Sequence, residues 1–153
     1  MSEHEQHLTP ALEAAAQRRR EVREALVAVE EAISSPAVEP DHWRARVGAT
    51  LAELDEAFEH HIAETEHPGG LYDEMERLAS HLSGKARRLR DEHPLIRASI
   101  AAERARLAVP LPVEAIDPVR DDLQRLLGRI VRHRQHGADL VWEAYAIDIG
   151  AAG

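Results

Sequence analysis

Histidines that interrupt apolar repeats are the residues of this chain whose type and spacing could do chemistry. The chain has ten histidines. Three of them, His61, His93 and His133, fall in segments where apolar residues recur every three or four positions. Neutral imidazole nitrogens are ligands for iron, zinc and copper. A buried imidazole without a partner costs on the order of 1–3 kcal/mol, so three of them in one core need either a metal ion or a hydrogen-bonded polar network.

Two charged residues accompany these histidines. Glu66 lies five residues after His61. Arg19 interrupts a fourth apolar repeat, and a guanidinium stays protonated and cannot ligate a metal. We therefore expect Arg19 either to bind an anion or clamp a carboxylate beside the metal, or to form an internal ion pair with Glu66.

Helix start and stop signals divide the chain into four long segments. Thr9 before Pro10 is typical of a helix start, Pro40-Asp41 offers a second N-cap, and Asp117-Pro118 repeats the capping residue followed by proline. Pro and Gly mark the ends. The predicted long helices cover about residues 10–34, 41–67, 83–109 and 117–149, with a short helical piece over 71–80. Pro94 directly follows His93, so we expect a kink or a restart in the third long helix.

The apolar repeats of these segments predict how the helices pack. Short connections favour an all-α, up-down-up-down four-helix bundle, with the short extra helical segment between the second and third helices. At a rise of about 1.5 Å per residue, Arg19, His61, His93 and His133 lie at similar depth, within roughly two turns. We expect one polar layer across the bundle. The predicted division is a flexible tail over residues 1–8, the bundle over 9–149 and a C-terminal tail over 150–153.

Composition excludes several classes of function. The 19 basic and 28 acidic residues give a net charge of −9, which disfavours binding to nucleic acid or to an anionic membrane. The absence of cysteine excludes disulfides and thiolate metal sites. No apolar run approaches the roughly 18 residues of a membrane span. With no nucleophile–base arrangement and no phosphate-binding glycine loop, we expect a cytoplasmic protein that is not an enzyme.

Three short motifs resemble those of the hemerythrin-like (HHE cation-binding) family, over about residues 10–148. They are His61-Ile62-Ala63-Glu64-Thr65-Glu66, Glu92-His93 and His133-Arg134-Gln135-His136. The resemblance implies a non-heme iron site in a four-helix bundle. The chain departs from the family pattern at four positions, which hold Arg19, Thr65, Arg97 and Gly137. A reduced site with about one iron, or zinc, is therefore expected instead of a full di-iron centre.

Two functions follow from these expectations. The first is a metal-binding bundle that handles iron, or that binds or senses a small diatomic molecule such as O2 or NO. Its expected metal ligands are His61, Glu66, His93 and His133, with Arg19 beside them. The alternative is a metal-free form of the same bundle that acts as a structural or protein-interaction module. The sequence names no protein partner for either function.

Overall fold

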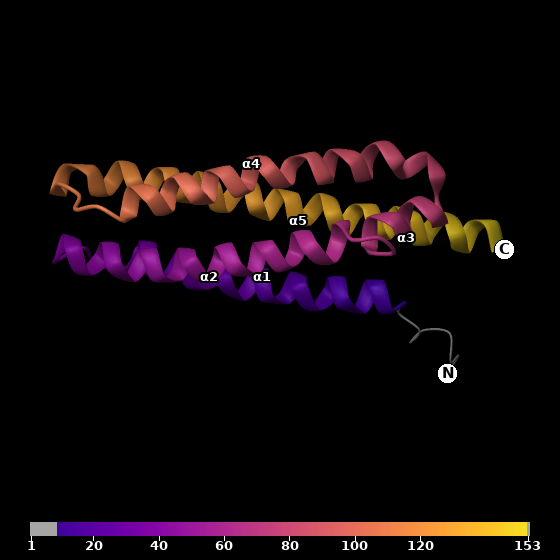
Figure 1. Ribbon diagram of the computed structural model, residues 1–153, viewed down its shortest axis with the longest axis horizontal. Coiled ribbons are helices and arrows are strands. Elements are labelled where there is room, and N and C mark those ends of the chain that lie inside the picture. Colours follow the sequence, from indigo (N-terminus) through magenta and orange to yellow (C-terminus); the bar gives the residue numbers. More distant parts are fainter. Residues whose placement is uncertain (1–8, 153) are drawn as a thin grey trace.

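The computed structural model describes residues 9–152, and its side chains as far as Ala146. Helix accounts for 88% of the structure, and the described residues contain no strand. Four long helices form an elongated bundle (Figure 1). They are α1 (Pro10–Ser34), α2 (Pro40–Glu66), α4 (Ser83–Leu107) and α5 (Ile116–Ala152), joined by the short α3 (Leu71–Leu78) and the single 3-10 turns η2 (Ser80–Leu82) and η3 (Val113–Ala115).

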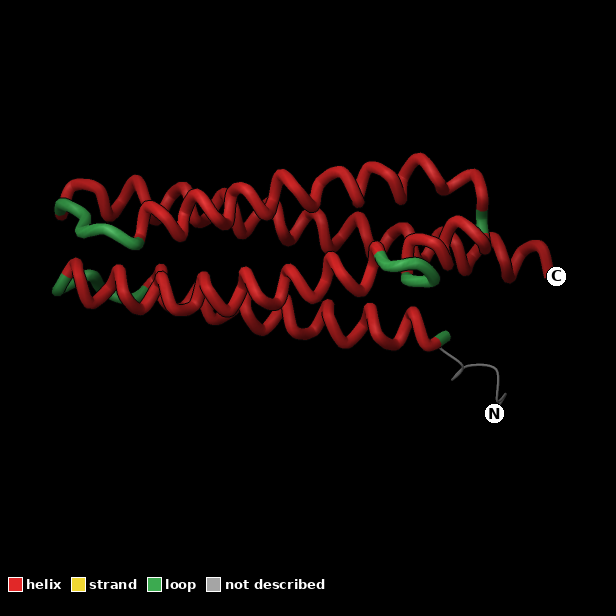
Figure 2. The backbone as a smooth tube through the Cα atoms, viewed as in Figure 1, coloured by secondary structure: helices red, strands yellow, loops and turns green. Residues whose placement is uncertain are grey.

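The four long helices alternate in direction along one axis. α1 packs on α2 and α5, and α4 packs on the same two helices, so α1 and α4 lie diagonally opposite in cross-section. The loops are confined to the two ends of the bundle (Figure 2). The predicted all-α, up-down-up-down bundle with an extra segment between its second and third long helices is confirmed.

Most helix limits agree with the capping signals. The Thr9 hydroxyl accepts a hydrogen bond from the Leu12 amide at 3.2 Å, as an N-cap should. The cap of α2 is Glu39, and Asp41 lies inside the first turn. α5 starts at Ile116, one residue earlier than predicted, because η3 leads directly into it.

The predicted C-terminal tail is wrong, and of the two effects expected at Pro94 the restart is absent. Residues 150–152 belong to α5, which runs to Ala152, whereas we expected a tail over 150–153; residues 1–8 lie outside the described part. α4 continues through Pro94 without the expected restart. Leu89 and Ile96 are buried on either side of the proline, and this packing holds the helix together although one backbone hydrogen bond is lost.

A tight turn directs α3 back over the bundle. Gly69 has a φ of 80°, in the left-handed region that favours glycine. A Cβ on Gly70 would lie 2.7 Å from the carbonyl oxygen of Glu64, so this position needs glycine as well. The turn brings α3 into contact with all four long helices. Leu71, Tyr72 and Met75 of α3 are thereby buried against them.

The buried side chains form two separate apolar clusters. The larger cluster includes Val22, Phe58, Ile96 and Ile130 and fills the half of the bundle that contains the α1–α2 and α4–α5 connections. The smaller cluster gathers around α3 in the other half. Its members are Ala15, Leu71, Tyr72, Met75, Ala79, Leu82, Ala86, Leu89, Leu140 and Ala144. In α1, α4 and α5 the boundary between the clusters falls at Arg19, His93 and His133, so the polar layer separates the two cores.

None of the helices in the described range combines the length and apolar character needed to cross a membrane.

Candidate metal centre

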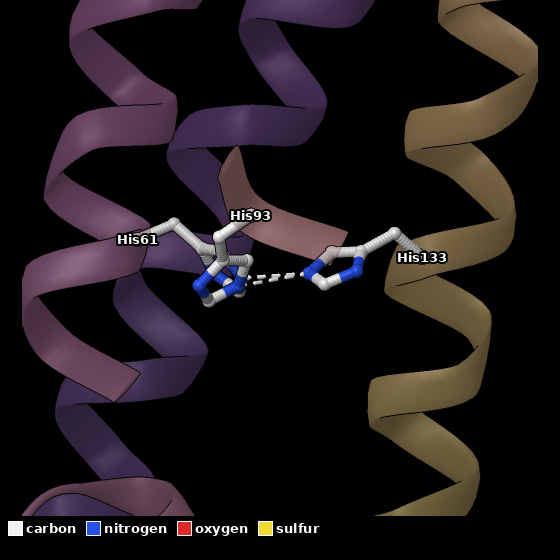
Figure 3. A group of neighbouring side chains, drawn as sticks. All are labelled: His61, His93 and His133. Atoms are coloured by element: carbon white, nitrogen blue, oxygen red, sulfur yellow. Dashed lines mark hydrogen bonds between the residues drawn. The ribbon is translucent and has the colours of Figure 1, made fainter. Parts of the chain in front are cut away.

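Three histidines from three different helices meet in the centre of the bundle (Figure 3). His61 comes from α2, His93 from α4 and His133 from α5. Their exposed fractions are 7%, 1% and 2%. The Nε2 atom of His133 lies 3.3 Å from that of His61 and 3.1 Å from that of His93. We call this group the histidine cluster.

The spacing of these nitrogens suits a metal ion. Metal–nitrogen bonds of about 2.0–2.1 Å in tetrahedral geometry separate neighbouring ligand atoms by roughly 3.3–3.4 Å. The two Nε2–Nε2 distances are close to this value, and one ligand atom from each histidine lies within 4.8 Å of the others. The described residues contain no other group of three such side chains arranged to hold an ion. The fold thus brings together the three histidines that the sequence pattern singled out.

Glu92 sets the orientation of His133. One of its carboxylate oxygens lies 2.9 Å from Nδ1 of His133. A carboxylate only accepts hydrogen bonds, so the proton of the neutral ring lies on Nδ1 and the lone pair of Nε2 faces the centre of the cluster. Metal-binding histidines commonly use their second nitrogen in this way.

Glu66 does not take the position predicted for it. Its carboxylate lies outside the histidine cluster, 3.4 Å from Nδ1 of His93 and 3.6 Å from Nε of Arg90. The alternative ion pair between Glu66 and Arg19 is not formed either. Thr65 occupies the inward position of this helical turn, and the next residue is rotated by about 100° around the axis. Glu66 therefore faces the outer edge of His93, where its charge favours a proton on Nδ1.

Hydrogen bonds within the protein do not satisfy the whole cluster. If His93 carries its proton on Nδ1, toward Glu66, its Nε2 lone pair faces the lone pair of His133 across 3.1 Å. If the proton is on Nε2, it can be donated to His133, but the Nδ1 lone pair then faces the Glu66 carboxylate. Each assignment places two electron-rich atoms against each other. A cation bound to both Nε2 atoms removes this conflict.

Burial keeps the rings neutral. Desolvation, followed by the nearby His133 and Arg19, lowers the pKa of His61 to about 3. Desolvation, with His61 as the next cause, lowers the pKa of His93 to about 2. The pKa of His133 is also lowered by burial, although Glu92 opposes that shift. At neutral pH all three imidazoles are uncharged, which is the form that ligates metals.

Tyr72 is a member of the site that the sequence analysis missed. Its hydroxyl lies 3.2 Å from Nε2 of His93, and its ring stacks on the His93 ring with centroids 5.8 Å apart. Burial raises the pKa of Tyr72, so the hydroxyl keeps its proton and donates to His93. The sequence signal for Tyr72 was a polar group on the buried face of α3. The sequence analysis did not predict which helices this short segment packs against, so it did not relate Tyr72 to the histidines.

Arg19 lies beside the cluster, as its depth predicted. It lines a small cavity together with His61 and His133, and its Nε is buried without a hydrogen-bond partner. Arg134 also lines the cavity, and its Nε is buried and unpartnered in the same way. The sequence motif contained Arg134, but nothing in its type or spacing singled it out.

Comparison with known proteins does not identify a family for this chain. No family model, no curated protein and no solved structure matches it. The hemerythrin-like resemblance therefore rests on the three sequence motifs, and the function is argued from the geometry of the site.

Proposed function

We propose that the protein binds one transition-metal ion per chain through the Nε2 atoms of His61, His93 and His133. The observation that carries this proposal is the convergence of three neutral imidazoles, of which His133 is oriented by its hydrogen bond to Glu92 so that its Nε2 lone pair faces the other two rings. Iron is the ion that the hemerythrin-like resemblance implies, and zinc suits the same three nitrogens. Glu66 acts from outside the ligand set, by its charge near His93.

Three protein ligands leave a coordination position free for a small molecule. A bound iron ion would supply the affinity for a diatomic molecule such as O2 or NO, consistent with binding, sensing or iron handling. The chain itself supplies a dry and rigid surrounding. Phe58 packs against all three histidine rings, with centroid distances of 5.5, 5.7 and 5.9 Å. A metal on Nε2 of His93 would take the lone pair to which the Tyr72 hydroxyl otherwise donates, and would leave that hydroxyl free to donate to a bound small molecule.

A metal-free structural role is the second candidate, and one observation favours it. Tyr72 can donate to His93, His61 can donate to His133, and His133 can donate to Glu92. This chain of hydrogen bonds satisfies part of the polar layer without an ion. It leaves the close contact between His93 and His133 unexplained, and for that reason we prefer the metal site.

Metal analysis of the purified, tag-free protein tests the proposal. We expect about one iron or zinc ion per chain after reconstitution, measured by elemental analysis. His133→Ala should lose the metal while its circular dichroism remains helical. His42→Ala, which removes an exposed histidine of α2, should keep it. A wild-type protein that takes up no metal, or a His133→Ala variant that binds it as well as wild type, would refute the proposal.

A further inference from the structure

The outward face of α5 is free of charged residues, although 31% of the chain is charged. This face lies opposite the buried side of the helix, which carries His133 and Leu140. Its positions recur at alternating spacings of four and three residues over about five helical turns, and we call them the uncharged face: Gln124, Gly128, Val131, Gln135, Ala138 and Trp142. Outward positions of α1 with the same spacing carry charges at three of four places, Arg20, Glu24 and Glu31.

Two residues leave apolar surface uncovered on this face. Trp142 is 72% exposed and Val131 is 50% exposed, whereas the other tryptophan of the chain, Trp43, is buried in the core. Tryptophan is highly buried on average in folded proteins and is enriched where proteins contact one another. Alternating spacings of four and three residues are those by which one helix packs along another. The uncharged face therefore fits a partner helix that lies along α5.

The charges that flank this face have opposite signs in its two halves. Between residues 124 and 135 every charged residue is basic, namely Arg125, Arg129, Arg132 and Arg134. Between residues 135 and 143 both charged residues are acidic, namely Asp139 and Glu143. An identical helix that runs in the opposite direction brings the basic half of each copy against the acidic half of the other. A parallel copy would place like charges together.

The same antiparallel pairing matches large residues to small ones. With Gln135 of both copies at the two-fold axis, Trp142 lies opposite Gly128 of the other copy, because each is seven residues from the centre. Val131 lies next to Ala138 of the other copy in the same way. The fold of one chain does not require glycine at position 128, where an added Cβ would meet only the end of a flexible side chain. Glycine is unfavourable inside a helix, and close approach of a tryptophan gives it a role here.

We infer that two copies of the chain associate through the uncharged face, with their α5 helices antiparallel about a two-fold axis near Gln135. Arg132 of each copy then lies beside Asp139 of the other. The contact consists of one pair of helices over about 30 Å, which is small for a protein interface, so the dimer dissociates at concentrations on the order of micromolar. The histidine cluster lies on the opposite side of α5, and the dimer does not depend on a metal.

Sedimentation velocity of the metal-free protein, from about 1 µM to about 1 mM, measures this association. Trp142→Ala should weaken it by about tenfold or more. Gly128→Gln should also weaken it, because the new side chain fills the space of the tryptophan from the other copy, while circular dichroism remains helical. Leu95→Ala changes an exposed apolar residue of α4, and Gly48→Gln changes a glycine whose added Cβ would have open space. These two controls should dimerise as wild type does.

Reversal of charges tests whether the partner is a second copy. Arg132→Asp should weaken the dimer by about tenfold, because it places acidic residues opposite one another at two symmetric positions. The double variant Arg132→Asp, Asp139→Arg should regain most of the lost affinity, since the two-fold symmetry again opposes unlike charges. A protein that stays monomeric at about 1 mM, a dimer that is insensitive to Trp142→Ala, or a double variant no tighter than Arg132→Asp would overturn the inference.

Discussion

The metal-free protein should lose stability steadily as the pH falls below about 7. In the unfolded chain, His61 and His93 take up protons around their ordinary pKa of 6.5, whereas in the folded protein burial lowers these pKa values to about 3 and about 2. At pH values between the folded-state and unfolded-state pKa values, the unfolded state binds more protons than the folded state. The free energy of unfolding must therefore decrease with falling pH.

The size of the effect follows from the same values. When the pH falls from about 7.5 to about 5, each histidine that stays neutral in the folded state lowers the free energy of unfolding by about 2 kcal/mol. His61 and His93 together give about 4 kcal/mol, and His133, whose pKa is also lowered, adds to this loss. A typical domain has a total stability of about 5–15 kcal/mol. Acidification to pH 5 should thus remove a large share of it.

The chosen pH window isolates the histidines. Glu21 and Asp122 have lowered pKa values, so their stabilising charges are lost only below about pH 4.5. Burial raises the pKa of Glu66 and of Glu103, which opposes the trend, but both side chains are partly exposed and their contribution is small.

Urea unfolding of the metal-free protein, followed by circular dichroism at a series of pH values, measures this dependence. His61→Leu should reduce the change across the window by about 2 kcal/mol. His42→Ala should leave the dependence unchanged, because that histidine is exposed. A free energy of unfolding that is constant between pH 7.5 and 5, or an equal dependence in wild type and His61→Leu, would show that the buried rings are not held neutral.

Four further substitutions test other parts of the structure. Glu92→Gln should weaken metal binding by about 10–100-fold in a competition titration with a chelator, while Glu59→Gln, on the surface, should not. Tyr72→Phe should lower the free energy of unfolding by about 1 kcal/mol, measured with urea, through loss of its hydrogen bond to the histidine cluster; an unchanged value would argue against that bond. Arg19→His removes a positive charge and adds an imidazole beside the cluster, so titration should show tighter metal binding or a second bound ion, and unchanged metal binding would contradict the charge argument. Gly70→Ala forces a Cβ against a carbonyl oxygen and should lower stability by about 1–3 kcal/mol in thermal unfolding; a neutral effect would show that the turn can relax.

The long helices and the three histidines could be predicted because helical periodicity is a local property. Apolar residues every three or four positions define one buried face, and counting along that face gives the depth of His61, His93 and His133 in the bundle. The same counting failed for Glu66. Glu66 follows the inward-facing Thr65 by one residue and therefore faces the flank of α2. The sequence alone did not decide whether Glu66 faces the interior of the bundle or its flank.

Other members of the site depend on tertiary structure. Tyr72 reaches His93 only because the turn at Gly69 and Gly70 folds α3 over the bundle. Arg134 becomes notable only when α5 is placed beside α1, which brings it to the same cavity as Arg19. No local pattern encodes either placement.

The division of the interior into two apolar clusters has a consequence for the kinetics of the site. The smaller cluster depends on the eight-residue α3 and on the terminal parts of α1 and α5, so local unfolding of this half requires less free energy than global unfolding. Such a partial opening uncovers His93 and Tyr72 while the larger cluster stays intact. Amide hydrogens of α3 should then exchange with solvent faster than those in the middle of α2. Exchange of ions or small ligands with the buried histidines should proceed at the rate of this local opening.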